Sequence, residues 1–568
     1  MGRTSHSTST GYARRGVARA AVCSLVCFGL LVSSCKLTSC GDGTNLEPDD
    51  PDKWAVETDI ARFVPTSARA VAFARDLDTF DAYASFIERR WSVPELQRAG
   101  RLVEELGAGE RFDREAAETL GLARRAPVAT FYDRGYWTIA LGVDEPERFE
   151  EAVEAAELEG KAADFGSFDA TYLEAGESSD SSLFLAHDGH LALIALPVEA
   201  HVDAESPRLP NLWLPDSERT RFVETNEHRD LLDRFRDGEL VGVVRPSTWL
   251  SNVESEGHAE VLRQQLMTQL GSVGFQLNSP SLDEKARLEV ALPGNPRAPE
   301  MVPELGEADG GLPPMGGLIE PGVLSVARLS VDPEQFYELA RSAMPAERRN
   351  DLIDTLEMLD KELRIDVESH VLENLRGHAM LVAYGLEREA FESDETPWFL
   401  ELVKLQATRE AILMPIRDRE PLEKVLDAWT TLSKSKLSRQ SAGQTLQYAW
   451  LEEGELQWAL ILSDEYIIFV DSAAAFEHAV AYEERARPLG EEFEEHGLTG
   501  LVDGPHQAGL FLDMATLTDL LAESERTEAV RWLRPFDSLL MTSGVDDDVG
   551  IVQVDARINA DGGDSDRE

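Results

Sequence analysis

The sequence predicts an α+β protein whose body consists of two tandem similar halves, each with antiparallel or mixed sheets and helices packed on one face. Three observations predict this fold class. The same motifs occur twice in the same order, at offsets of roughly 254 to 276 residues. Strands are followed by helices or by hairpins with Asp, Gly and Pro in their turns. No glycine-rich phosphate loop follows a strand, so a fully parallel doubly wound sheet is the less favoured alternative.

The first repeated motif is a proline turn, an apolar strand and an amphipathic helix. It reads "VPTSARAVAFARDLDTFDAYASFI" near the start of the body and returns as "EPGVLSVARLSVDPEQFYELARSAM", so that Pro65 corresponds to Pro321. The second motif is a strand, an acidic turn with proline and a helix, "WTIALGVDEPERFEEAVEAA" and "AILMPIRDREPLEKVLDAW". In its two helices the apolar positions recur at helical spacing. They are Phe149 and Val153 in the first copy, and Leu422 and Leu426 in the second.

A hairpin and a glycine-containing strand follow in both copies. The hairpins are "SLFLAHDGHLALIAL" and "QWALILSDEYIIFVD", with Asp188 and Asp464 in the same turn, and Asp-Gly between apolar runs is a strong hairpin signal. Next come "LVGVVRPSTWLSNV" and "QAGLFLDMATLTDLL", in which Gly242 corresponds to Gly509. Each copy closes on an alternating strand, "KARLEVAL" or "GIVQVDARI". Because four landmarks keep one order, we interpret the body as a tandem duplication.

The composition of the chain sets the expected boundaries. The first α+β half is expected at 55–292 and the second at 318–560, followed by an acidic disordered tail at 561–568. Between the halves, residues 293–317 contain 12 prolines and glycines among 25 residues, which is typical of a linker.

The N-terminal segment predicts export and a lipid anchor. Arg14, Arg15 and Arg19 precede an apolar run of 13 residues, whereas a membrane-spanning helix needs about 20. We therefore expect residues 1–34 to be a signal peptide. Its end, "VSSC", resembles the lipobox of bacterial lipoproteins, which implies acylation of Cys35. The alternatives are the looser match at Cys40 and an ordinary cleavable signal with an incidental cysteine.

The expected location follows from this leader. Residues 35–53 are polar, with Gly, Pro and Asp, and we interpret them as a flexible tether in the cell envelope. The residue after Cys35 is lysine rather than the aspartate that favours inner-membrane retention in enterobacterial lipoproteins. By that resemblance the expected place is the outer membrane, facing the periplasm or the cell surface. Leader and repeats together resemble the uncharacterised acidic, lipobox-bearing proteins of delta-proteobacteria and a broad bacterial family of exported proteins of unknown function. That resemblance implies no catalytic residues.

The charge of the chain excludes one class of partner. Removal of the leader would leave 50 basic and 106 acidic residues, a formal charge of −56. Such a charge repels nucleic acid and anionic lipid head groups, so nucleic-acid binding is not expected. The acids are spread along the chain, which is typical of a solvated surface in a salty habitat.

Motifs that would specify chemistry are missing from the sequence. It contains no His-Glu-x-x-His helix, no Gly-x-Ser-x-Gly elbow and no phosphate or dinucleotide loop, and we expect no cofactor. One weak metal candidate, "AHDGHLALIALPVEAHVD", combines histidines with a carboxylate that could converge on zinc or copper. Its residues are His187, Asp188, His190 and His201. The alternative is a solvated turn, because the second copy has Ser463 and Tyr466 at the matching places.

Three functional hypotheses remain, and none of them has a sequence signature. The first is a non-enzymatic, membrane-anchored envelope lipoprotein that binds a protein or has a structural role. The second is a carrier or chaperone for lipids or other apolar ligands in the periplasm, and the third is an enzyme with an unrecognised site. The tryptophans Trp137, Trp249, Trp429 and Trp458 lie within predicted elements. Aromatic residues there are usually core, but an apolar-ligand groove would use the same residue types.

Overall fold

The chain divides into two compact units, which are described separately. In this computed structural model the described residues are 59–91, 93–133, 135–156, 160–165, 168–173, 183–187, 190–197, 222–245, 272–281, 285–293, 323–330, 333–334, 337, 346–364, 366–386, 407–432, 436–452, 454–473, 475–477, 479–480, 508–523, 530–531, 533–546 and 549–559. We call Phe28–Pro296 together with Val545–Glu568 the first unit, and Arg297–Gly544 the second unit. Among the described residues, no helix has the length and apolar character needed to cross a membrane.

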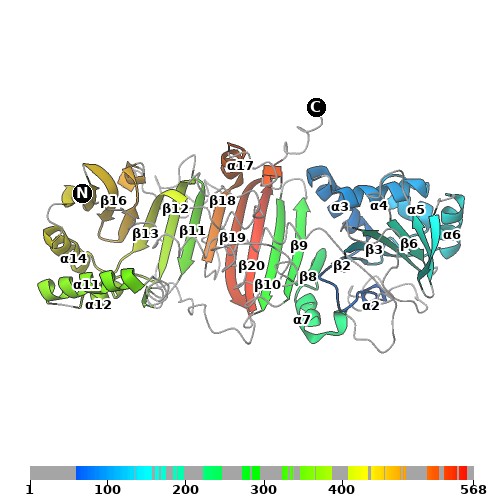
Figure 1. The fold of residues 1–568 in the computed structure, drawn as a ribbon, viewed down its shortest axis with the longest axis horizontal. Coiled ribbons are helices and arrows are strands. Elements are labelled where there is room, and N and C mark those ends of the chain that lie inside the picture. The colour runs from blue at the N-terminus through cyan, green and yellow to red at the C-terminus, as the bar shows by residue number, and fades with distance from the viewer. Residues whose placement is uncertain are drawn as a thin grey trace, which may run out of the picture. The chain divides into compact units, whose positions relative to one another are not determined.

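The first unit combines helices and strands (Figure 1). Its helices are α2 (Asp59–Arg62), α3 (Leu77–Trp91), α4 (Pro94–Glu105), α5 (Arg114–Leu120), α6 (Pro146–Ala155), the 3-10 helix η4 (Phe222–Glu224) and α7 (Asn226–Arg234). Its strands are β1 (Ala70–Ala74), β2 (Val128–Asp133), β3 (Tyr136–Gly142), β4 (Gly160–Phe165), β5 (Phe168–Leu173), β6 (Leu183–His187), β7 (Leu191–Pro197), β8 (Leu240–Val244), β9 (Val273–Ser281), β10 (Lys285–Pro293) and β20 (Val549–Ile558).

Local sequence signals explain where several of these helices begin and end. The helices α4 and α6 start at Pro94 and Pro146, where a proline costs no hydrogen bond because the first helical N–H has no partner. Asp113 caps α5 by accepting a hydrogen bond from the backbone N–H of Ala116 at 3.0 Å. The same helix ends at Gly121, whose φ of 65° places it in the left-handed region that favours glycine.

The strands of the first unit pair antiparallel throughout. Their order is β4-β5-β6-β7-β3-β2-β1-β8-β9-β10-β20. The predicted antiparallel α+β class is therefore confirmed for this unit, as is the predicted pairing of β6 with β7 as a hairpin. The terminal strand β20, which the sequence boundaries had assigned to the second half, pairs with β10.

Helices cover both faces of this sheet, which corrects the expectation of one covered face. One core cluster joins α2, η4 and α7 to residues of the strands, and another joins α3, α4, α5 and α6 to the alternate residues (Figure 1). All seven residues of β3 are buried, as are the first six of β7. A strand buried on both sides is uniformly apolar instead of alternating, and "LALIALP" in β7 has this pattern.

The second unit has the same kinds of element. Its helices are α11 (Ala346–Leu363), α12 (Val367–Leu372), α14 (Arg419–Leu432) and α17 (Met514–Glu523). Its strands are β11 (Ser325–Ser330), β12 (His378–Leu386), β13 (Ala407–Pro415), β14 (Leu437–Ala442), β15 (Thr445–Glu452), β16 (Glu455–Leu462), β17 (Tyr466–Val470), β18 (Ala508–Asp513) and β19 (Phe536–Asp546).

The second unit repeats the strand order of the first. Its strands follow the order β14-β15-β16-β17-β13-β12-β11-β18-β19, and every pair is antiparallel. The predicted β16–β17 hairpin is confirmed. Gly242 of β8 lies opposite Ala72 of β1, and Gly509 of β18 lies opposite Arg328 of β11. Each glycine thus lies in a central strand: β8 pairs with β1 and β9, and β18 pairs with β11 and β19.

A helical layer covers one end of the second unit's sheet. The buried residues Leu422 and Leu426 of α14 pack on β14–β17, where Tyr448 is completely buried. The outer side of α14 contacts α11 and α12 through Val425, Leu359 and other apolar residues. The predicted apolar helical positions 422 and 426 thus face the core.

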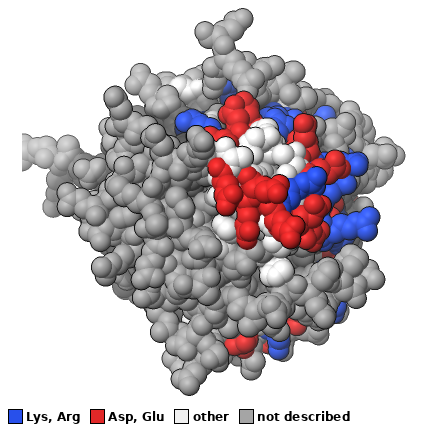
Figure 2. Space-filling model, turned by 90° about the vertical axis from the view of Figure 1, so that its right-hand side faces the viewer, with Lys and Arg blue, Asp and Glu red and all other residues white. Residues whose placement is uncertain are grey.

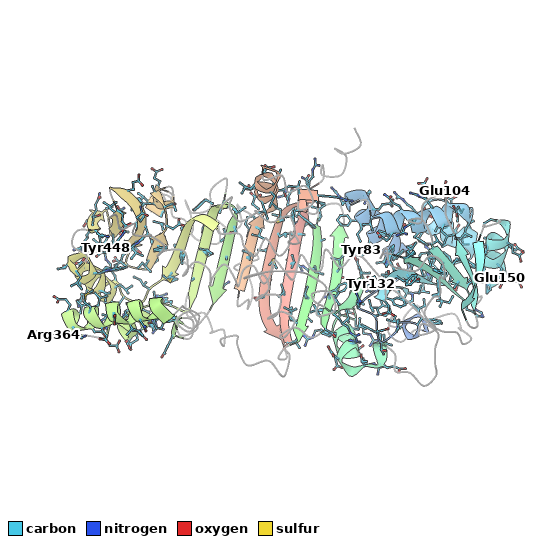
Figure 3. All side chains as sticks on the ribbon, in the orientation of Figure 1. Tyr83, Glu104, Tyr132, Glu150, Arg364 and Tyr448 are labelled. Carbon is cyan, nitrogen blue, oxygen red and sulfur yellow. The ribbon has the colours of Figure 1, made fainter. Side chains whose placement is uncertain are left out.

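The end of α11 contains a strained residue that predicts a stabilising substitution. Arg364 has a φ of 58°, a conformation that costs a non-glycine residue about 1 kcal/mol (Figure 3). Its side chain is exposed. We expect Arg364→Gly to raise the free energy of unfolding of the second unit by about 0.5–1 kcal/mol. Urea unfolding measures this, with Arg364→Ala as the control, since alanine keeps the strain; equal stabilities of the two variants would contradict the assignment.

Candidate functional site

The structure describes two of the four sequence-predicted metal residues. His187 ends β6, and His190 lies just before β7, where its carbonyl oxygen accepts a hydrogen bond from the N–H of Val143 at 2.9 Å. The ring of His187 contacts Phe149 of α6 edge-on, with centroids 5.5 Å apart. Asp188 and His201 lie outside the described residues, as does Cys35. Within the described ranges no three His, Cys, Asp or Glu side chains are arranged to hold a metal, and the metal and lipid-attachment assignments stay predictions.

A polar cluster around one buried histidine lies where η4 and α7 meet the end of β8 in the first unit. His228 is only 1% exposed, and its ring stacks on Phe222 with centroids 3.9 Å apart. Its Nδ1 lies 3.0 Å from the carbonyl oxygen of Phe222, and its Nε2 lies 3.2 Å from Nη2 of Arg245. We call His228, Arg245, Glu227 and Phe222 the imidazole cluster.

Arg245 joins this cluster to the neighbouring strands. Its Nη1 donates to the carbonyl oxygen of Thr66 at 2.7 Å, and its guanidinium lies 5.5 Å from the centre of the Phe222 ring. Burial lowers the pKa of Arg245, while the negative charges of Glu227 and then of Asp133, at the end of β2, favour its charged form. Asp133 itself is 2% exposed and accepts a hydrogen bond from the hydroxyl of Ser67 at 3.0 Å.

The hydrogen bonds fix the protonation state of His228. A guanidinium has only donors, so Nε2 must accept from Arg245, and Nδ1 must carry the proton that is donated to Phe222. The imidazole is therefore neutral. Burial, followed by the charge of Arg245, lowers the pKa of His228 to about 4, whereas hydrogen bonds from Ser272 hold the pKa of Glu227 below its usual range.

In this arrangement the imidazole of His228 cannot act as an acid or base on a bound molecule. Both ring nitrogens have partners within the fold, so neither can accept a proton from a bound molecule in this conformation. The sequence contained one signal for it that we did not use. His228, Leu231, Leu232 and Phe235 follow the i, i+3, i+4, i+7 spacing of a buried helix face, so a histidine there needs partners.

The second unit contains a half-buried cluster of three tryptophans. Trp450 of β15 lies opposite Trp458 of β16, and their rings stack at 5.6 Å with 13° between their planes. Trp429 of α14 lies 5.4 Å from Trp458 and 6.4 Å from Trp450. All three side chains keep part of their surface in solvent. We call these residues the tryptophan cluster.

The core interpretation of the predicted tryptophans is confirmed only in part. Trp137 of β3 is 6% exposed and its indole N–H donates to the hydroxyl of Thr130 at 3.0 Å. Trp429 and Trp458 are half-buried instead, and Trp249 lies outside the described residues. The completely buried aromatic residue on the same face is Tyr448, whose hydroxyl donates to Asp427 at 2.8 Å (Figure 3).

Charged residues flank the tryptophan cluster. The ammonium of Lys436 lies 5.5 Å from the centre of the Trp450 ring and 3.2 Å from a carboxylate oxygen of Glu452. Arg439 of β14 pairs with Glu423 at 2.6 Å and with Asp427 at 2.9 Å, both on α14. Glu455 adds an exposed acid beside the β15–β16 turn. This rim therefore holds four acids and two bases.

The helices α4, α5 and α6 of the first unit carry a different surface. Figure 2 shows many acidic side chains there with arginines among them. The exposed acids include Glu104, Glu118 and Glu150, and some are paired, as in Glu118 with Arg114 at 2.6 Å. Exposed pairs of this kind contribute little to stability. This surface therefore fits the solvated acidic exterior expected from composition.

Comparison with known proteins adds no assignment. No protein-family model matches the chain, and no curated protein or solved structure matches it.

Proposed function

We propose that this protein is a non-enzymatic, lipid-anchored protein of the bacterial envelope that binds a partner protein through its tryptophan cluster. The cluster is the observation that carries the proposal. Three indole rings from three separate elements meet at the surface and stay partly in water. Tryptophan is enriched among the few residues that dominate protein-binding energies, because it buries a large area with little loss of side-chain freedom.

The surroundings of the cluster support a protein partner. Protein interfaces have an apolar, often aromatic centre and a polar rim, and here the rim is formed by the Lys436–Glu452 and Arg439–Asp427 pairs. Its four acids outnumber its two bases, and the whole chain has a formal charge of −52. We therefore assign the partner a basic rim around an apolar centre, which favours encounter through opposite charge.

The anchor in this proposal is Cys35, and the tether after it would hold the body away from the bilayer. The signal-like leader and the "VSSC" pattern support it. The mass of the N-terminal peptide, isolated with detergent from the native membrane, tests it directly. A diacylated peptide beginning at Cys35 is expected, and a free thiol at that residue would remove the anchor without affecting the binding surface.

We also propose that the two units arose by duplication. The common strand order supports this origin, and so does the position of the glycines. The proline motifs align Ala72 with Arg328, and these two residues lie opposite Gly242 and Gly509, which the glycine motifs align independently. The tryptophan cluster would then be a specialisation of one copy, because Trp429, Trp450 and Trp458 lie in the second unit alone.

Site-specific photo-crosslinking in the native host tests the binding surface. We expect a photoreactive residue in place of Glu455 to link a specific protein, and the same residue in place of Glu150 on α6 to leave that protein unlinked. Trp458→Leu should weaken binding by about 30-fold, since loss of a central interface residue costs about 2 kcal/mol or more. The exposed neighbour Leu451 provides the matched control, because Leu451→Ala should leave the link intact. A link that persists at full strength in Trp458→Leu, or no link at position 455, would overturn the proposal.

A further inference from the structure

The imidazole cluster allows only one protonation state of His228. Nε2 has no proton, because the group 3.2 Å away is the guanidinium Nη2 of Arg245, which can only donate. A second proton on the ring would therefore point one N–H at another and place two positive charges in contact. The ring cannot turn to avoid this, since it is stacked on Phe222 and its Nδ1 is held by the Phe222 carbonyl oxygen.

We propose that η4 and α7 form an acid-operated latch, which stays packed on the first unit while His228 is neutral and opens when the ring takes a second proton. The contacts define what would move. The residues of this segment that pack into the core are apolar: Phe222, Val223, Leu231, Leu232 and Phe235. Leu231 and Phe235 lie against Gly274 of β9, where a Cβ atom would meet them at 3.0 and 3.3 Å. Opening would thus expose an apolar surface that is covered at neutral pH.

The charged groups around the ring act in opposite directions. Arg245, after β8, opposes the imidazolium, and burial opposes it more strongly. Glu227, on α7 itself, favours the imidazolium. Glu227 and then Asp133, at the end of β2, also favour the charged form of Arg245. Just before β9, the backbone N–H of Ser272 donates a hydrogen bond to the carboxylate of Glu227 at 3.0 Å. The balance lowers the pKa of His228 to about 4 from about 6.5.

The direction of the pH effect follows from this shift. A histidine whose pKa is lower in the packed state binds more protons when the segment is open. The contribution of His228 to packing is therefore complete above pH 6.5 and is lost as the pH falls from 6.5 to 4. Lowering the pKa from 6.5 to about 4 allows a change of roughly 100-fold in the opening equilibrium between pH 7 and pH 4.

Hydrogen exchange followed by mass spectrometry on the full-length protein tests the latch. After correction for intrinsic exchange rates, the protection of amides 226–234 should fall roughly 100-fold from pH 7 to pH 4. Amides of α14 in the second unit are the internal control and should change much less. In His228→Gln, a neutral amide replaces the imidazole, and the pH-dependent loss of protection in α7 should disappear.

A second variant keeps the test decisive if His228→Gln does not fold. Glu227→Gln retains a hydrogen-bond acceptor for Ser272 but removes the negative charge that favours the imidazolium. The packed-state pKa of His228 then falls further below that of the open state, so by the linkage above α7 should lose more protection at pH 4 in this variant than in the unchanged protein. Nuclear magnetic resonance of the His228 ring carbon follows the protonation of the ring itself over the same pH range. Parallel loss of protection in α7 and α14, or the same protection of α7 at pH 4 with and without Glu227→Gln, would refute the latch.

Discussion

Replacement of Gly242 by alanine is expected to destabilise the first unit by about 3 kcal/mol. The glycine lies in β8 between β1 and β9, and an added Cβ would collide with the carbonyl oxygen of Val71. It would also meet the ring of Phe275, at 2.5 Å from Cζ and 2.7 Å from Cε1. The oxygen belongs to the main chain of β1, so the strands must separate to admit a single methyl group. Overpacking of this kind costs about 1–3 kcal/mol, with the upper end where backbone must move.

Two further variants divide this cost between its sources. Phe275→Leu removes the ring that lies over Gly242, so the double variant Gly242→Ala/Phe275→Leu should recover part of the loss but not the part that comes from Val71. Phe275→Leu alone is the reference for the double variant. The measurement is urea unfolding, followed by hydrogen exchange of β8. Full recovery in the double variant would show that the main-chain collision has no effect.

Replacement of Arg245 by methionine is expected to cost about 2–3 kcal/mol of unfolding free energy. The substitution removes the donor to the carbonyl oxygen of Thr66 and the donor to Nε2 of His228. It also leaves the carboxylate of Asp133, 2% exposed, without the positive charge of Arg245. Arg245 is half-buried, and loss of hydrogen bonds made by a charged group costs about 1.5–3 kcal/mol.

The control for this substitution lies close to it in the fold. Arg69→Met deletes a guanidinium of the same size, half-buried like that of Arg245, that lies 5.5 Å from the ring centre of Tyr132. Its loss should cost about 1 kcal/mol or less. Arg245→Met should also raise the pKa of His228 toward its usual value, so the stability of this variant should depend less on pH between 4 and 6.5. Equal losses in the two methionine variants would contradict a stabilising role of the imidazole cluster.

Local patterns in the sequence predicted the elements, and long-range packing decided how they are covered. The first proline-turn motif, the β6–β7 and β16–β17 hairpins and the apolar positions of α6 and α14 were readable because each depends on residues that are near in the chain. Pro321 of the second proline-turn motif lies outside the described residues. The sequence did not predict that helices cover both faces of the sheet in the first unit. The run "LALIALP" fits a strand buried on two sides, but it does not identify α2, η4 and α7 as the second cover.

The candidate sites were harder to predict for the same reason. The imidazole cluster and the neighbours Thr66 and Asp133 that act on Arg245 come from four separate segments of the chain, and no short motif contains them. The tryptophans of the second unit were visible as residues. Their partial exposure depends on where α14 ends over β15 and β16, and that position is a property of the folded unit.

The pairing of β10 with β20 has a consequence for folding during synthesis. Pro293 pairs with Val549, about 256 residues later, so a nascent chain completes one edge of its first sheet only after the whole second unit has been synthesised. During that interval the backbone N–H and C=O groups on one side of β10 are unpaired, and they can form hydrogen bonds with a strand of another chain. A chain truncated before residue 549 would therefore be prone to misassembly through β10, and the need for chaperones should be greatest before β20 has been synthesised.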